Sequence, residues 1–323
     1  MASQTTLEAP SLAEILSARE RIRGSVLRTP LVRLRDGDSD GGGEREIYLK
    51  LENLQPTGSF KMRAAANAMA AAAPGDLERG VYTASAGNMA QGVAWNARAR
   101  GIPARIIVPD HAPLNKLRAI EALGGEVVKL PFHQWWEVLV ANGSATEQGY
   151  FIHPVCNREV IAGNGTIGLE IVEELPDVDT VIVPYGGGAL STGIAIAVRA
   201  QRPDAKVYAC EVETAAPLAA SLDAGEPVTV DYKATFVDGI GSSSVLPPMW
   251  PLVIAALSGS LVVSLEQIED AIRRLFTAHR VVAEGAGASS LAAALANADI
   301  GRRVVCIVSG GNINIETLAR IVT

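Results

Sequence analysis

The chain has 323 residues, of which 48% are hydrophobic and 20% charged, and its 28 Lys and Arg against 35 Asp and Glu give a net charge of −7. This composition excludes a disordered protein and argues against nucleic acid or an anionic membrane surface as the main partner. No apolar run approaches the roughly 20 residues of a membrane span, and the N-terminal residues do not resemble a secretory leader. Three well-separated cysteines predict no disulfide framework and favour a cytoplasmic location: Cys156, Cys210 and Cys306.

Regular alternation of strand and helix patterns begins near residue 80. Short β-branched segments alternate with Ala- and Leu-rich segments of helical length, which predicts an α/β fold with parallel sheets. The expected strands are 81–83, 105–108, 126–130, 180–183, 207–210, 261–264 and 303–308, and the expected helices are 89–100, 115–123, 167–175, 191–201, 265–278 and 288–296. Before this region, the polar, glycine-rich segment 36–46 predicts a solvated surface loop.

The segment 48–73 places a lysine at the start of a helix. A Pro-Thr-Gly turn comes first, Ser59 is expected to cap the helix, and an Ala-rich run follows, so Lys61 falls in the first helical turn. The helix dipole and the small apolar neighbours disfavour the ammonium form there and lower the pKa of the amine. The ordinary alternative is an exposed surface lysine. The apolar surroundings favour instead a nucleophilic amine that can form a Schiff base.

The loop 85–89 follows the strand expected at 81–83 and leads into the helix expected at 89–100. It contains Ser85, Ala86, Gly87, Asn88 and Met89. Free backbone N–H groups at a helix start attract anions, so the loop suits a substrate carboxylate. Ser309 follows the last expected strand, at the sheet end where open α/β folds bind ligands. Each of these two features alone could also be a simple helix cap or turn.

A glycine-rich loop follows the strand expected at 180–183, and it contains Gly186, Gly187, Gly188, Ala189 and Leu190. Glycine lacks the Cβ that would keep a phosphate away, and consecutive N–H groups before a helix form an anion cradle. A tight strand-to-helix turn would need only one glycine. Three in a row therefore favour phosphate binding.

Two better-known phosphate motifs are incomplete. The segment 188–193 has P-loop glycine spacing but is followed by Ile194 where a P-loop has lysine. The segment 163–168 reads Gly-Asn-Gly-Thr-Ile-Gly but follows no strand, so the dinucleotide-binding interpretation lacks its structural context. We expect a loop leading into a helix there, with close packing.

Taken together, six motifs in order resemble the fold-type-II pyridoxal-phosphate enzymes, specifically the threonine/serine dehydratase and serine racemase group. They are GSFKMRAA, SAGNMAQGVAW, IAGNGTIGLEI, VPYGGGAL, EGAGA and SGGNIN. The resemblance implies an α/β fold with two open parallel-sheet domains, similar to the β subunit of tryptophan synthase. By this resemblance, 1–79 and 159–323 form a large cofactor-binding domain, and 80–158 form a small mobile domain that binds substrate.

The resemblance also implies roles for individual residues. Lys61 is the lysine that joins pyridoxal 5′-phosphate, and Phe60 packs against the cofactor ring. Asn88 contacts the ring hydroxyl oxygen, and Ser309 meets the pyridine nitrogen. The loop 85–89 binds the substrate carboxylate, and the phosphate receives backbone N–H groups from Gly186, Gly187, Gly188, Ala189 and Leu190. The implied activity is elimination of water and ammonia from a threonine- or serine-like β-hydroxy amino acid, giving a 2-oxo acid, by a homodimer.

The sequence departs from the family pattern at several positions. Racemases of the family carry a serine where this chain has Ala86, and a methyl group cannot transfer protons. Met89 replaces a common histidine, which is either neutral drift or a sign of a substrate other than threonine. Glu211 and Ala215 match the first two ligands of the family's divalent-metal site, but Pro217 stands in place of the aspartate, so no metal is predicted.

The sequence leaves other functions open. An amino-acid racemase and a β-replacement synthase share the fold. A nucleotide-binding oxidoreductase using 163–168 and a protein that holds the cofactor without turnover are alternatives from other classes.

Overall fold

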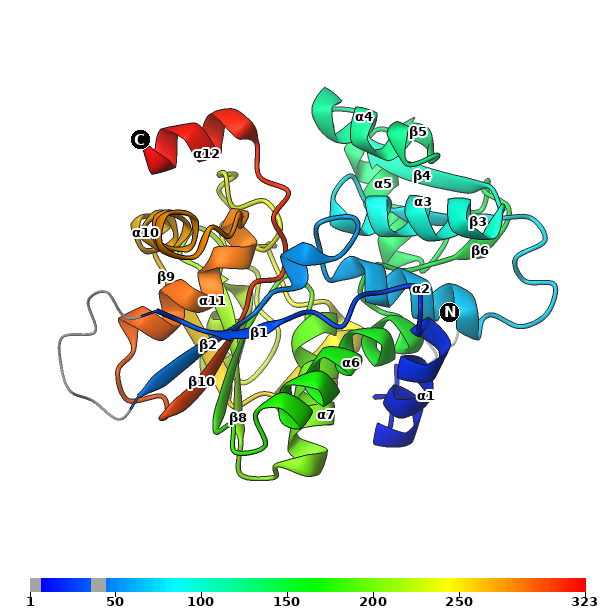
Figure 1. The fold of residues 1–323 in the computed structure, drawn as a ribbon. Helices are drawn as coiled ribbons and strands as arrows, with labels where there is room; N and C mark the ends of the chain where they lie inside the picture. Colours follow the sequence, from blue (N-terminus) through cyan, green and yellow to red (C-terminus); the bar gives the residue numbers. More distant parts are fainter. Residues whose placement is uncertain (1–6, 36–44) are drawn as a thin grey trace.

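The computed structural model describes residues 7–35 and 45–323, so most of the loop expected at 36–46 lies outside the described residues. Two separate sheets organise the chain, one of six strands and one of four. Figure 1 shows them as two bodies, with α2 (Lys61–Ala71) lying between them. Within the described ranges, no helix is both long and apolar enough to cross a membrane.

The larger sheet is parallel except at one edge, where β1 and β2 run antiparallel. Its spatial order is β1 (Leu31–Arg33), β2 (Glu46–Lys50), β10 (Arg303–Ile307), β7 (Thr180–Pro184), β8 (Lys206–Val212) and β9 (Gly259–Val263). The smaller sheet is parallel throughout, in the order β5 (Glu126–Leu130), β4 (Ala104–Pro109), β3 (Val81–Ala84) and β6 (Tyr150–Phe151).

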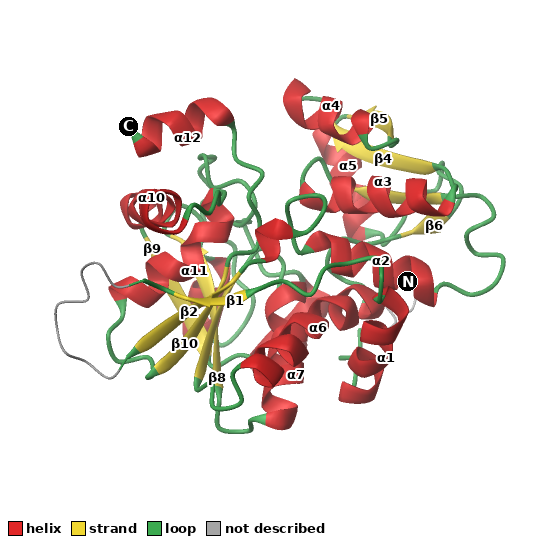
Figure 2. Ribbon diagram, viewed as in Figure 1, coloured by secondary structure: helices red, strands yellow, loops and turns green. Residues whose placement is uncertain are grey.

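Helices cover both faces of the larger sheet, as Figure 2 shows. Along β7, Ile182 packs in one core cluster with residues of α10 and α11, whereas Val181 and Val183 pack in another with α6 and α7. This alternation is the two-residue period of a strand, and burial of both faces explains its continuous apolar sequence. The helices not yet given are α1 (Leu12–Ile22), α3 (Asn88–Arg100), α4 (Leu114–Ala122), α5 (Phe132–Val140), α6 (Arg158–Glu174), α7 (Ala189–Gln201), α8 (Pro217–Ala224), α9 (Trp250–Ala256), α10 (Leu265–Arg274), α11 (Gly285–Ala296) and α12 (Ile315–Val322).

The α/β fold and every strand and helix expected after residue 80 are confirmed, with shifts at the ends that are largest for α6, which begins already at Arg158. The alternation pattern did not reveal β1 and β2, which precede residue 80 where the alternation begins, or β6, which is only two residues long. The expected helix 265–278 is α10 followed by a π-helical turn at Leu275–His279. The expectation of a Ser59 cap on α2 is wrong: Phe60 already has helical dihedral angles, and the buried Ser59 hydroxyl has no partner among the described residues.

The segment 163–168 does not form a loop but lies inside α6, where it is completely buried. Its glycines allow neighbouring helices to approach. A Cβ at Gly163 would lie 2.6 Å from the Arg63 carbonyl of α2, and one at Gly168 would lie 2.8 Å from the Ile194 carbonyl of α7. The expected close packing is therefore confirmed, and the expected loop is wrong.

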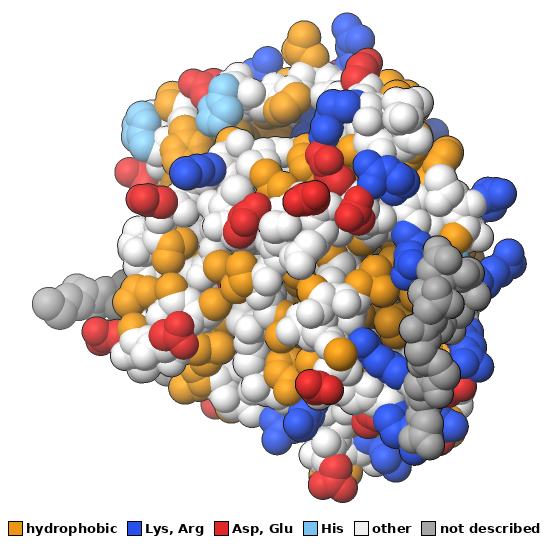
Figure 3. Space-filling model, turned by 90° about the vertical axis from the view of Figure 1, so that its left-hand side faces the viewer, with side chains coloured by type: hydrophobic (Ala, Val, Ile, Leu, Met, Phe, Trp, Pro, Cys, Tyr) orange, Lys and Arg blue, Asp and Glu red, His pale blue; other side chains and the backbone are white. Residues whose placement is uncertain are grey.

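On the face of the molecule that lies to the left in Figure 1, positive and negative side chains are not gathered into separate patches. Figure 3 shows acidic, basic and apolar side chains interspersed there. This agrees with the modest net charge of −7.

Candidate active site

A cleft of about 370 Å³ lies between the two sheets, where α2 and the carboxyl ends of β3, β7 and β10 converge. Every residue that the sequence suggested for cofactor or substrate binding lines it: Phe60, Lys61, Ser85, Ala86, Gly87, Asn88, Met89, Gly186, Gly187, Gly188, Ala189, Leu190 and Ser309. These residues come from four segments that are far apart in sequence. The loops after the parallel neighbours β7 and β10 end on the same side of the larger sheet, and the packing of the smaller sheet against the larger one brings the loop after β3 to the same cleft.

Lys61 is the first residue of α2, and its side chain points into the cleft. Its Nζ donates a hydrogen bond to the carbonyl oxygen of Pro154 at 3.0 Å and lies 5.1 Å from the centre of the Phe60 ring. Burial lowers the pKa of this amine to about 8. An amine with this pKa is partly neutral near physiological pH, which nucleophilic attack and proton abstraction both require.

The turn before α2 is tied to the loop after β10. The Phe60 N–H donates to the Ser309 carbonyl at 3.0 Å, and the Gly311 N–H donates to the Gly58 carbonyl at 2.9 Å. Lys61 and Ser309 therefore sit on two segments whose relative position is fixed by backbone hydrogen bonds.

The glycine-rich loop leads directly into α7, whose first N–H groups have no partner within the helix. Gly188 has φ = +96°, a conformation that favours glycine. Ala189 begins the helix and keeps a negative φ, so its N–H is free for an external acceptor, as a glycine N–H would be at this position. At Gly187 a Cβ would lie 2.5 Å from Cγ2 of Val155, so only glycine fits there.

Asn88 links three segments at the start of α3. Its Nδ2 donates to Oε1 of Glu284 at 2.8 Å, and its Oδ1 accepts from Nδ2 of Asn312 at 2.8 Å. Glu284 is 7% exposed, and burial raises the pKa of its carboxyl group to about 7. A carboxyl group that titrates near neutrality inside a cleft is a feature of functional sites.

Several lining residues did not stand out in the sequence motifs. Lys116 of α4 pairs with Asp238 at 2.6 Å across the mouth, and Trp135 of α5 and Pro154 also line the cleft. No local pattern marks these positions, because they reach the cleft only through the packing of the smaller sheet against the larger one.

Comparison with known proteins decides the family. Residues 22–310 match the family described as pyridoxal-phosphate dependent enzyme. This chain belongs to that family. It is 41% identical to the L-threonine ammonia-lyase of Thermotoga maritima over 97% of this chain and 78% of the relative, and 36% identical to the catabolic L-threonine dehydratase of Escherichia coli over 96% and 95%. The structure of maize serine racemase superposes with a TM-score of 0.89 at 32% identity, covering 97% of each chain.

The cleft of this pyridoxal-phosphate dependent enzyme fits its cofactor. The cofactor requires an amine for attachment and an anion site for its phosphate. Lys61 provides an amine whose hydrogen-bond partner is a carbonyl, and the loop 186–190 provides N–H groups at the start of a 13-residue helix. Gly186 lines the cleft, and a Cβ there would make only ordinary van der Waals contacts, the nearest with the Gly239 carbonyl oxygen at 3.5 Å.

Glu211, the one side chain among the weak metal candidates, is engaged by other contacts. The Glu211 carboxylate accepts hydrogen bonds from the N–H groups of Leu218 and Ala219, both at 2.8 Å, and from the Ser260 hydroxyl at 2.6 Å. It therefore caps α8, which begins at Pro217. Among the residues that the structure describes, no group of three His, Cys, Asp or Glu side chains is arranged to hold a metal ion.

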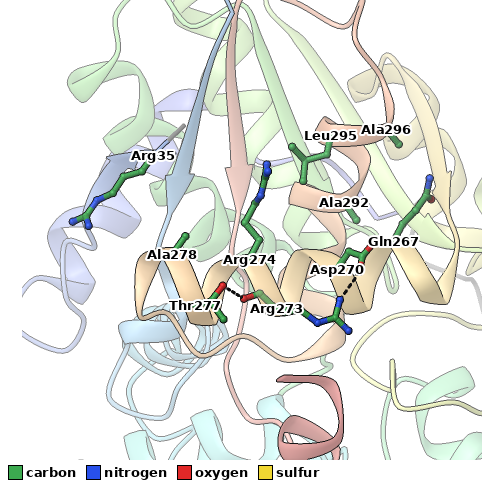
Figure 4. A pocket seen from close by; sticks show the side chains of 10 residues that line it. All are labelled: Arg35, Gln267, Asp270, Arg273, Arg274, Thr277, Ala278, Ala292, Leu295 and Ala296. Atoms are coloured by element: carbon green, nitrogen blue, oxygen red, sulfur yellow. Dashed lines mark hydrogen bonds and ion pairs between the residues drawn. The ribbon is translucent and has the colours of Figure 1, made fainter. Parts of the chain in front are cut away.

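A second cavity, of about 640 Å³, lies between α10 and α11 and contains none of the residues suggested by the sequence motifs. Figure 4 shows Arg274 extending from α10 towards Leu295, whereas Arg273 donates to Asp270 on its own helix. No lysine that could join pyridoxal phosphate lines this cavity, so the cleft at Lys61 is the candidate active site.

Proposed function

We propose that this enzyme is an ammonia-lyase that removes water and ammonia from a β-hydroxy amino acid such as L-threonine or L-serine and releases a 2-oxo acid. The observation that carries the proposal is the convergence on one cleft of Lys61, the glycine-rich loop, Ser309 and the loop 85–89. The relatives named L-threonine ammonia-lyase and L-threonine dehydratase align with almost the whole chain, which supports this reaction.

In this proposal Lys61 joins the cofactor, and the N–H groups of 186–190 hold its phosphate. Phe60 packs beside the ring, Asn88 contacts the ring hydroxyl oxygen, and Ser309 faces the pyridine nitrogen. When bound, pyridoxal phosphate supplies an electron-withdrawing ring that makes the α-hydrogen of an amino acid acidic. A hydroxyl opposite the pyridine nitrogen is a weak proton donor, so it favours the neutral ring and rapid elimination.

The chain's own residues then bind the substrate and move the proton. The N–H groups of the loop 85–89, at the start of α3, hold the substrate carboxylate. Once displaced by the substrate amine, Lys61 takes the α-proton on Nζ as a general base, for which its lowered pKa is suited. The Cβ–O bond would then break while its oxygen takes up a proton, for which the cofactor phosphate would be the donor, and leaves as water. Lys61 would give up the α-proton and take the place of the enamine, which reacts with water to give ammonia and the 2-oxo acid.

Racemisation is the second candidate, because the chain also superposes on maize serine racemase. It requires a proton donor in addition to Lys61. Ala86 occupies the position at which the resemblance implies a serine, and its methyl group carries no exchangeable proton. Elimination is therefore the better-supported reaction.

We also propose that residues 80–158 move as a small domain over the substrate. All four strands of the smaller sheet fall within this range, and the Lys116–Asp238 ion pair joins it to the rest of the chain at the mouth of the cleft. A homodimer and a cytoplasmic location complete the proposal, and light scattering of the purified protein tests the oligomeric state.

The test is a visible spectrum of the purified protein followed by 2-oxo acid release from L-threonine, L-serine and larger β-hydroxy amino acids. We expect a bound chromophore in the wild type and its loss in Lys61→Ala, with turnover reduced at least about 1000-fold. Lys129→Ala, at an exposed position on β5, is the matched control and should leave both unchanged. Formation of 2-oxo acid by Lys61→Ala at the wild-type rate would overturn the proposal, as would a colourless wild type after incubation with pyridoxal phosphate.

A further inference from the structure

The turn that connects β6 with α6 touches two parts of the candidate active site. The Pro154 carbonyl accepts the hydrogen bond of Lys61 Nζ at 3.0 Å, and Val155 fills the space where a side chain at Gly187 would lie. Both Pro154 and Val155 line the cleft. The conformation of this turn therefore bears on the lysine and on the glycine-rich loop together.

The buried side chain of His153 accepts hydrogen bonds from two backbone N–H groups of this turn. Its side chain is 2% exposed, and its Nδ1 lies 2.9 Å from the Val155 nitrogen and 2.7 Å from the Cys156 nitrogen. Because both of those N–H groups donate, Nδ1 must be the unprotonated nitrogen. The proton is then on Nε2, which faces the Leu139 carbonyl of α5 at 3.3 Å.

The ring remains neutral at physiological pH. Burial lowers the pKa of His153 to about 4, and the nearby charge of Lys61 acts in the same direction. A neutral ring can keep accepting two backbone N–H groups, whereas a protonated ring would lose the acceptor at Nδ1. These hydrogen bonds therefore persist over the pH range in which Lys61 titrates.

Backbone chemistry explains why the turn needs to be held by His153. The Pro154 carbonyl shares a planar peptide unit with the Val155 N–H, which donates to His153 Nδ1, and proline restricts the residue before it to extended conformations. The direction of the Pro154 carbonyl then depends on how the following N–H groups are held, and both of them point at His153.

We propose that His153 is a positioning residue for Lys61, which aims the Pro154 carbonyl at Nζ and so orients the amine for its reaction. The proposal rests on the proposed role of Lys61. The other titratable groups that line the same cleft are His111, Glu284 and the Lys116–Asp238 pair. Glu284 is engaged by Asn88, and Lys116 and Asp238 bind each other, whereas the Pro154 carbonyl contacts Nζ directly.

A consequence for proton binding follows from the direction of this hydrogen bond. A carbonyl can only accept, and an ammonium group donates a stronger hydrogen bond than a neutral amine does. The Pro154 carbonyl thus favours protonated Lys61 and partly offsets the effect of burial. If the turn loosens, the pKa of Lys61 should fall.

Two substitutions separate the two sides of the imidazole ring. His153→Asn places an amide oxygen near the position of Nδ1 and can keep the contacts with the turn, but it cannot reach Leu139. His153→Gln reaches towards Leu139 and lacks an acceptor at the Nδ1 position. His133→Gln, at an exposed histidine on α5, is the control for the substitution itself.

The measurement uses the full chain from which the cofactor has been removed. The rate at which visible absorbance returns after addition of pyridoxal phosphate is followed from pH 6 to 10, since only the neutral amine attacks. The wild-type midpoint should lie near 8, the value to which burial lowers the pKa of Lys61. We expect the midpoint of His153→Gln to be lower by about half a unit to one unit, with kcat of the holoenzyme reduced about tenfold and KM little changed.

His153→Asn and His133→Gln should keep the wild-type midpoint within experimental error. Equal midpoints for His153→Gln and the wild type, with only a lower melting temperature, would reduce His153 to a structural role and overturn the proposal. Equal shifts of the pH midpoint in His153→Asn and His153→Gln would also overturn the proposal. A wild type that regains no absorbance would instead contradict the role of Lys61, so the two failures are distinguishable.

Discussion

Asn88 and Glu284, which are 196 residues apart, meet inside the cleft, where Nδ2 of Asn88 donates to Oε1 of Glu284 at 2.8 Å. Asn88 begins α3 beside the smaller sheet, and Glu284 precedes α11 on the larger one. This hydrogen bond therefore joins the two bodies of the protein at the candidate active site. It also places a buried carboxyl group beside a residue proposed to contact the cofactor ring.

Glu284 should make the stability of the protein depend on pH. Burial raises the pKa of its carboxyl group from 4.5 to about 7. Below pH 4.5 the group is protonated in both folded and unfolded chains. Between pH 4.5 and 7 only the unfolded chain releases the proton, so the stabilising contribution is lost as pH rises through this range.

We expect Glu284→Gln to remove this dependence, because glutamine keeps the acceptor for Asn88 and does not ionise. The free energy of unfolding of the wild type, measured relative to this variant, should fall by at most about 3 kcal/mol between pH 4.5 and 7 and then remain level. Urea unfolding at several pH values measures the difference. Glu266→Gln, at an exposed position on α10, is the control. If the free energy of unfolding of the wild type relative to Glu266→Gln fell with pH by the same amount, the assignment to Glu284 would be contradicted.

Ala86 should decide between elimination and racemisation. It lines the cleft together with Lys61, and its methyl group cannot transfer a proton. We expect the wild type to form no D-serine from L-serine while it releases pyruvate, and Ala86→Ser to form measurable D-serine because a hydroxyl then faces the cleft. Chiral chromatography and deuterium incorporation from D₂O measure both. Rapid D-serine formation by the wild type would show that another group supplies the second proton.

The sequence predicted the residues of the cleft well where the relevant feature is local. Lys61, the loop 85–89 and the loop 186–190 each lie at a helix start or strand end, where open α/β sheets bind their ligands, so each could be recognised from its local sequence. His153 and the Lys116–Asp238 pair were not predicted. Their significance depends on contacts between distant segments, with 93 residues separating Pro154 from Lys61 and 122 residues separating the members of the ion pair.

The glycines of α6 illustrate the opposite error. Glycine disfavours helices, so the segment 163–168 predicts a loop on local propensity. The structure shows a buried helix instead. The backbones of the neighbouring helices lie so close to this segment that they leave no room for a side chain, which explains the glycines. Tertiary packing overrides propensity here, and the required closeness cannot be derived from the segment itself.

Gly163→Ala should therefore destabilise the protein although alanine favours helices. The new Cβ would lie 2.6 Å from the Arg63 carbonyl, a backbone atom that cannot move without shifting α2. We expect a loss of about 1–3 kcal/mol in the free energy of unfolding and a lower kcat, because α2 carries Lys61. Gly87→Ala provides the stability control, since nothing lies within 4 Å of its Cβ position and its φ of −111° is outside the left-handed region. Equal stability of the Gly163→Ala variant and the wild type would show that the helices can separate freely.

Arg63 supports α2 from the side opposite the cleft. It is 1% exposed and forms paired hydrogen bonds with two buried carboxylates, Glu52 at 2.8 and 2.9 Å and Glu170 at 2.6 and 2.9 Å. Lys50, which is fully buried, also contacts Glu170 at 2.7 Å. Lys50 also lies 3.4 Å from the more exposed Glu174, so the buried part of the network consists of two cations, Arg63 and Lys50, and two anions, Glu52 and Glu170.

Arg63→Met should be strongly destabilising, because it leaves Glu52 buried without its cation and Glu170 with only Lys50. Removal of one partner from a buried ionic network costs about 3–5 kcal/mol, whereas an exposed ion pair contributes about 1 kcal/mol or less. Arg320→Met tests this contrast, since Arg320 pairs with Glu269 at 2.7 Å but its side chain is 57% exposed. Urea unfolding of both variants at pH 7 measures the difference. Losses of similar size in the two variants would mean that water reaches the Arg63 network and screens its charges, in which case α2 would be held in place by its apolar contacts alone.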